Sequence, residues 1–161
     1  MSVTITGLDQ LEKFVGTLRA LQIRLLLNAK SATAQISAHL AERARVNAPI
    51  LTGRLIEELV PIPTTLTAGG IHGGVVSPVS KGGVYYGAEI HEKQVPKGAK
   101  YQLGPKTRQK PPTEEGGPGG GHIDRVAEYH LHRTGGYIEI MRKAVEAALQ
   151  SRELSSGEII L

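Results

Sequence analysis

The sequence predicts an α+β fold, in which a long N-terminal helix and a C-terminal amphipathic helix pack on a small, mainly antiparallel β-sheet. Apolar residues recur at three- and four-residue steps over residues 8–47 and again over residues 136–154, as along one face of a helix. Between these segments, short runs rich in Val, Ile and Tyr follow pairs of glycines, which is typical of strands in a meander. Residues 93–135 are rich in Gly, Pro and Lys and are expected to form a long insertion.

The first expected elements are a short strand over residues 2–6, where apolar and polar residues alternate, and the helical pattern over residues 8–47. A single helix of that length would extend about 60 Å, more than one domain usually spans. We therefore expect a break or bend at Gly16 or within residues 28–31, giving a short helix followed by a long one. The second half is rich in Ala, which predicts a slim face that another element can approach closely.

The helical pattern ends at a sharp turn with the sequence APILTGRL. Pro49 has no N–H to donate and disfavours helical geometry at Ala48, so the helix is expected to stop there. Thr52 can cap the next turn through its hydroxyl, and Gly53 can adopt a positive φ. The turn folds the segment that starts near Leu55 back against the helix, so these residues are expected to set the fold rather than to bind a ligand.

The segment after the turn combines residues that favour a helix with residues that break one. Its first residues, from Arg54, are compatible with a helix, but Pro61 and Pro63 forbid a helix further on. Residues 73–80 and 82–92 each open with a Gly pair and are expected to be two strands of a meander.

The C-terminal part is expected to combine an extended insertion with an amphipathic helix. The insertion, residues 93–135, is expected to lack regular structure, although residues 122–133 could hold a short helix or strand. The helix over residues 136–154 is expected to present one apolar face, formed by Ile138, Met141, Val145 and Ala148.

The composition limits the kinds of protein that the chain can be. With 40% apolar and 21% charged residues, the 161 residues are expected to form a single globular domain, residues 1–161. The absence of Cys excludes disulfides, thiolate metal sites and cysteine nucleophiles. No run approaches the roughly 18 apolar residues of a membrane span, and the N-terminus lacks the order of a signal peptide. We therefore expect a protein that is made and used without secretion.

No enzymatic activity, cofactor or metal is expected. His91 and Glu92 begin like a zinc-protease box, but the second His is missing at the required spacing. His130 and His132 would face one side of a strand and could share a metal, although polar surface is the better interpretation. The glycines before His122 lack the Lys-Ser/Thr of a phosphate-binding loop and are interpreted as a flexible tether. The third hypothesis is a metal-dependent hydrolase that uses His91, Glu92, His130 and His132.

Three motifs occur in order along the chain. The opening motif Gly-Leu-Asp-x-Leu lies at Gly7, Leu8, Asp9 and Leu11. The motif Ala-Pro-x-x-Thr-Gly-x-Leu lies at Ala48, Pro49, Thr52, Gly53 and Leu55. A Tyr-containing strand closing on an acid is matched more loosely by Tyr86 with Glu89 or Glu92. Over residues 5–92 and 136–150 the chain thereby resembles the neck, or tail-completion, proteins of long-tailed bacteriophages. It departs from them where Lys93 replaces the glycine after the last acid, and where GGYIEIM replaces a Pro-Phe-Leu turn.

The resemblance implies a virion structural protein at the head–tail junction, made in the host cytoplasm and without enzymatic activity. A DNA channel demands rotational symmetry, so such proteins work as closed rings, and the family implies six or twelve copies. The implied partners are the connector or stopper on one side and the tail-terminator or tail-tube protein on the other. Passing contact with double-stranded DNA is also implied, and contact with a membrane is not.

The positive charge of the chain is concentrated in residues 93–110. This arm holds six basic residues and no acid, whereas the rest of the chain has thirteen basic and fifteen acidic residues. Its prolines favour an extended chain, so it is expected to contact a partner protein or the DNA channel. The candidate contact residues are Lys93, Lys97, Lys100, Lys106, Arg108 and Lys110. The alternatives are a nucleic-acid-binding module that uses this arm, and a solvated loop whose charges only keep the protein soluble.

Overall fold

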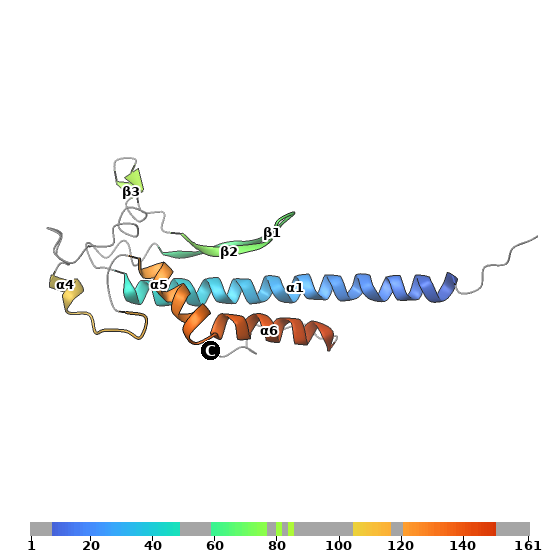
Figure 1. Cartoon of the computed structure of the whole chain (residues 1–161). Coiled ribbons are helices and arrows are strands. Elements are labelled where there is room, and N and C mark those ends of the chain that lie inside the picture. Colours follow the sequence, from blue (N-terminus) through green and yellow to red (C-terminus); the bar gives the residue numbers. More distant parts are fainter. Residues whose placement is uncertain are drawn as a thin grey trace, which may run out of the picture.

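The structure is a computed structural model that describes residues 8–48, 59–76, 80–81, 84–85, 105–116 and 121–150. It confirms the α+β class, because a long N-terminal helix is combined with a two-stranded antiparallel sheet and further helices. The long helix α1 (Leu8–Asn47) forms the axis of the molecule. A hairpin of β1 (Val60–Thr67) and β2 (Gly70–Val76) lies along one side of it, and helix α6 (Gly136–Leu149) lies along another (Figure 1).

Helix α1 is continuous over its 40 residues, so the expected break at Gly16 or within residues 28–31 is wrong. A side chain at Gly16 would meet no heavy atom within 4 Å, and a single helical glycine costs only about 1 kcal/mol relative to Ala. Residues 28–31 lie where α6 packs on α1, and this packing supports a straight helix there. The helix ends at Asn47, two residues before Pro49, as the sequence predicts.

The Ala-rich half of α1 is buried between the hairpin and α6, as its slim face predicts. Ala32 and Ala144 are 0% and 1% exposed in the seam between α1 and α6, where they pack with Tyr137 and Ile140. On the other side, Ala44 packs with Ala48 and Leu59 in a second apolar cluster. Small side chains at these positions let the backbones approach closely.

Helix α6 buries the predicted face only in part. Ala148 is fully buried and Met141 is partly buried, as predicted, whereas Ile138 and Val145 are 58% and 44% exposed. The buried face is formed by Tyr137, Ile140, Ala144, Ala147 and Ala148. The predicted face and the buried face both have helical spacing. The face with more alanines is buried because its small side chains allow α6 to lie close to α1.

The strands pair differently from the expected meander. Strand β2 pairs with β1, from Val60↔Val76 to Thr67↔Gly70, and β1 includes both prolines of the mixed segment. A separate two-stranded ladder joins β3 (Ser80–Lys81) to β4 (Val84–Tyr85). Within the described ranges β1 has a sheet neighbour on one side only, so a proline's missing N–H can face away from the ladder, and prolines are tolerated there.

The insertion is not structureless in its described parts. It contains α4 (Pro105–Arg108), α5 (His122–Glu128) and a π-helix, η1 (Tyr129–Arg133), and α5 packs against α1. The helix alternative for residues 122–133 is therefore confirmed. Of the fold-motif turn, Ala48 is described and fully buried, whereas Pro49, Thr52, Gly53 and Leu55 lie outside the described residues, as does the strand expected over residues 2–6.

Candidate functional site

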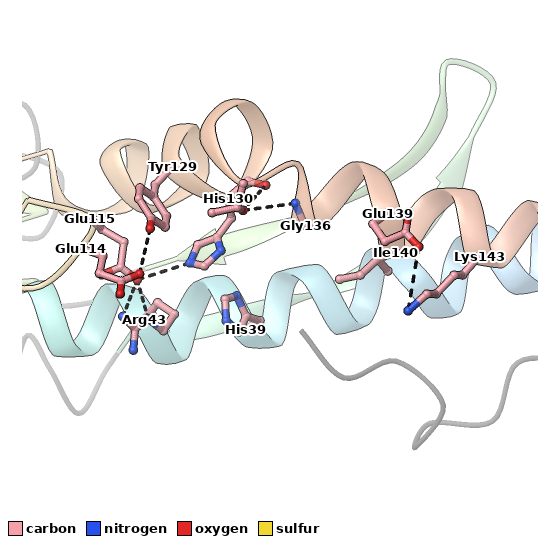
Figure 2. Close-up of a pocket in the computed structure, with 11 residues that line it drawn as sticks. His39, Arg43, Glu114, Glu115, Tyr129, His130, Gly136, Glu139, Ile140 and Lys143 are labelled. Atoms are coloured by element: carbon pink, nitrogen blue, oxygen red, sulfur yellow. Dashed lines mark hydrogen bonds and ion pairs between the residues drawn. The ribbon is translucent and has the colours of Figure 1, made fainter.

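The most connected polar group is a cluster at the C-terminal end of α1, which we call the Glu115 cluster. It consists of Arg43, Asn47, Thr113, Glu115 and His130 (Figure 2 shows three of them). The Glu115 side chain is 1% exposed, and its Oε1 accepts a hydrogen bond from Arg43 Nε at 2.6 Å. His130 Nε2 lies 3.3 Å from the same oxygen, and Asn47 Nδ2 donates to Oε2 at 3.4 Å. The cluster thus ties α1, the segment before α5 and the π-helix together.

The carboxyl group of Glu115 is held in its ionised form. Burial by itself raises its pKa, but hydrogen bonds from Arg43, its own backbone N–H, Thr113 and His130 outweigh burial and lower the pKa to about 2. A carboxylate with so low a pKa is a weak base and is poorly suited to general acid–base catalysis near neutral pH. The geometry therefore indicates a structural ion pair.

A second group of rings continues the cluster toward α6. His39 Nδ1 lies 3.1 Å from Tyr137 Oη, and the His39 ring meets the His130 ring edge-on at a centroid distance of 4.6 Å. Burial, followed by the nearby His130 and Arg43, lowers the pKa of His39. Burial and then the Glu115 carboxylate raise the pKa of Tyr137 to about 12. Both groups are therefore neutral at physiological pH and join α1 to α6.

These groups line an open hollow of about 520 Å³ between α1, the π-helix and the start of α6 (Figure 2). Its rim carries Glu114, Glu139 and Lys143 in addition to the buried groups. The charged rim groups are themselves paired: Glu114 accepts a hydrogen bond from Tyr129 Oη at 2.8 Å, and Glu139 lies 4.0 Å from Lys143 Nζ. The hollow mixes both signs of charge and has no feature that selects one class of ligand.

The basic arm is described in part. Lys110 caps the C-terminus of α1, because its Nζ donates to the carbonyl oxygens of Arg45, Val46 and Ala48 at 3.3, 2.8 and 2.8 Å. Burial lowers the pKa of this ammonium group. This capping role was not foreseen, since the sequence offers no signal for a contact across more than 60 residues.

Of the other candidates in the arm, only two are described. Lys106 and Arg108 are exposed on α4, and Lys93, Lys97 and Lys100 lie outside the described residues. Contact of these side chains with a partner or with DNA remains a prediction.

The candidate metal residues are not brought together in the part of the chain that the structure describes. His130 faces Glu115, whereas His132 is exposed on the same π-helix, and His91 and Glu92 lie outside the described residues. Among the described residues, no group of three or more His, Asp or Glu side chains is placed to hold a metal ion. Nor does any helix within the described ranges have the length and apolar character needed to cross a membrane.

The N-terminal half of α1, residues 8–27, is an exposed apolar surface that we call the α1 rod. Figure 1 shows that the rod extends beyond the ends of the hairpin and α6. Eight large apolar side chains of the rod are 37–59% exposed: Leu8, Leu11, Phe14, Val15, Leu18, Ile23, Leu26 and Leu27. The helical pattern predicts an amphipathic helix with Leu8, Leu11, Val15 and Leu18 on its apolar face, but periodicity identifies such a face and not what covers it.

Comparison with protein families finds no matching family model, and comparisons with curated proteins and with solved structures find no match either.

Proposed function

We propose that the chain is a structural protein of the head–tail junction of a long-tailed bacteriophage, where it forms a ring around the DNA channel. The observation that carries this proposal is the α1 rod, in which a single copy leaves eight large apolar side chains exposed. Contiguous apolar surface of this kind marks an interaction site in a folded protein. A subunit of a larger assembly covers such a surface with another copy or with a partner protein.

Other features support the same proposal. The chain carries the three motifs in the order of the neck proteins, and its buried charges serve to hold the fold together. In the proposed role it acts without a catalytic site or cofactor. Its partners are further copies of itself, six or twelve in number, and the connector or stopper and the tail-terminator or tail-tube proteins. It is located in the virion neck after synthesis in the host cytoplasm.

The proposal is tested by locating the protein in virions of the phage that encodes it. Antibodies against the chain should label the junction of head and tail in electron micrographs, and mass measurement of isolated necks should give six or twelve copies. Label on the capsid, on the tail tip or on no part of the virion contradicts the proposal.

The basic arm supplies a second test. Replacement of Lys97, Lys100, Lys106 and Arg108 by Ser should leave the melting curve intact and lower the fraction of heads joined to tails. Charges repeated around a ring create a field that attracts an acidic partner or DNA and that salt weakens. Full infectivity of particles with this variant refutes a docking role for the arm and leaves solubility as its function.

A nucleic-acid-binding module is the second candidate function. The observation that favours it is the exposure of Lys106 and Arg108 within a segment of six basic residues. DNA binding by the isolated protein that weakens linearly with the logarithm of salt concentration supports this candidate. Absence of binding at low salt excludes it.

A further inference from the structure

We infer that the α1 rod is a self-association surface on which the same segment of a second copy of this chain docks, with the two rods antiparallel. The inference goes beyond the proposed function, because it concerns the pairing of two copies and holds for the chain itself, whether or not it acts in a phage neck. Four observations on α1 lead to it: the seven-residue spacing, the continuity with α6, the apolar area and the distribution of charge.

The first observation is a seven-residue repeat that runs through both halves of α1. Leu11, Leu18 and Leu25 follow one another at seven-residue intervals, and the next position of the series is Ala32. Ala32 is 0% exposed because α6 packs on it, whereas Leu11 and Leu18 are 58% and 48% exposed. A sustained seven-residue repeat is the pattern by which helices pack side by side in coiled coils.

A second series on the neighbouring positions gives the same result. Phe14 and Leu21 lead at seven-residue intervals to Asn28, whose Nδ2 donates to the carbonyl oxygen of Ala144 in α6 at 3.3 Å. Both series that meet α6 in the second half of α1 therefore continue into the rod, where Phe14 is 59% exposed. The rod presents the same face that already packs against a helix, so its occupant is expected to be helical.

The exposed area suits a second copy. Six exposed residues lie on one arc of the rod: Leu8, Leu11, Phe14, Val15, Leu18 and Leu26. At roughly 100 Å² of apolar surface each, they provide about 600 Å² per copy, near the lower limit of stable protein–protein interfaces. A helix of this length that protrudes alone is marginally stable in water, since tertiary packing supplies most helix stability. Pairing of two rods provides that packing for both copies at once.

The charges of the rod favour the antiparallel direction. Its first turns carry Asp9 and Glu12 together with one basic residue, Lys13, whereas its second half carries Arg19 and Arg24 and no acid. An antiparallel pair brings the net acidic turns of one copy beside the basic half of the other, whereas a parallel pair brings the two basic halves together. The antiparallel contact uses the same surface twice and closes on a twofold axis. It also places the two hairpin and α6 regions at opposite ends of the pair.

The first test compares three proteins by sedimentation equilibrium at micromolar concentrations: the full chain, Leu18→Glu and Ala20→Glu. The two variants add the same charge to the exposed rod, but residue 20 lies about 200° around the helix from residue 18. We expect the full chain to self-associate, Leu18→Glu to lower the association constant at least 100-fold, and Ala20→Glu to change it less than threefold. Circular dichroism melts of all three proteins verify that the folded part is retained.

The outcomes of this test are distinct. The inference is supported if Leu18→Glu abolishes self-association and Ala20→Glu preserves it, because only residue 18 lies on the apolar arc of the α1 rod. A monomeric full chain, or self-association that Leu18→Glu leaves intact, overturns the inference. Neither result depends on labelling of virions, so failure of this inference and failure of the proposed function are separately visible.

The second test fixes the direction. The chain contains no Cys, so an introduced Cys is unique. In an antiparallel pair, two copies of Leu18→Cys place their thiols near each other at the middle of the rods and form a disulfide-linked dimer under mild oxidation. Two copies of Leu8→Cys place their thiols about 30 Å apart and remain unlinked. Rapid linkage of Leu8→Cys indicates parallel rods and overturns the antiparallel arrangement.

Discussion

Replacement of Glu115 by Gln should destabilise the protein by about 1–3 kcal/mol at neutral pH, because it removes the charge at the centre of the Glu115 cluster while preserving its shape. The pKa of Glu115 falls from its ordinary value of 4.5 to about 2 in the folded chain. At about 1.4 kcal/mol per pKa unit, this shift corresponds to an upper limit of about 3 kcal/mol of stability at neutral pH. The loss should be smaller than this limit, because the Arg43 side chain is 34% exposed and can turn toward water.

The effect should depend on pH in a defined direction. Since the folded-state pKa of Glu115 is depressed, its contribution is fully present above the unfolded value of about 4.5 and is lost as the pH falls toward about 2. The difference in unfolding free energy between the wild type and Glu115→Gln should therefore be largest at pH 5–7 and close to zero near pH 2. Urea unfolding followed by circular dichroism at several pH values measures this difference.

The matched control is Glu114→Gln at the neighbouring position. Glu114 is exposed and accepts one hydrogen bond, from Tyr129 Oη, so its replacement should change stability by less than about 0.5 kcal/mol. Equal effects of the two variants, or a Glu115→Gln effect that does not change between pH 7 and pH 3, would refute the assignment of a stabilising buried ion pair.

Three further substitutions and a titration test other parts of the fold. Gly73→Ala should cost about 1–3 kcal/mol, because its Cβ would lie 2.6 Å from Ser37 Oγ, and an unchanged thermal midpoint would contradict this close approach of β2 to α1. Gly16→Ala should instead raise stability by about 0.5–1 kcal/mol, since the new methyl group meets nothing within 4 Å, and a lower midpoint would show that α1 bends there. Lys110→Met should lower the free energy of unfolding by about 1–2 kcal/mol in chemical unfolding, because three carbonyl groups at the end of α1 lose their donor, and an unchanged midpoint would contradict this capping role. Because the pKa of His39 is lowered by burial, stability should be fully present above pH 6.5 and decrease below it, and a His39→Gln variant with the same pH slope would exclude this residue as the cause.

The sequence by itself was sufficient for the local elements of the fold. The α+β class, the end of the first helix before Pro49 and a C-terminal helix that begins at Gly136 follow from periodicity and from the backbone chemistry of proline. The close approach of the hairpin and α6 to α1 follows from the alanines in the second half of α1, because their small side chains leave room for a neighbour. These features depend on residues that are near one another in the chain, so they can be predicted from the sequence alone.

Only the tertiary structure decided which faces and partners those elements have. Helix α6 has two stripes of helical spacing, and the choice of the Tyr137–Ile140 stripe depends on the shape of α1. The pairing of Arg43 with Glu115 joins residues 72 positions apart, and no local pattern distinguishes this acid from the exposed Glu114 before it. The continuity of α1 and the exposure of its rod depend on where α6 and the hairpin end relative to α1. A repeat in one chain specifies that a helix has an apolar face, but whether that face is core or interface depends on how far its neighbours extend.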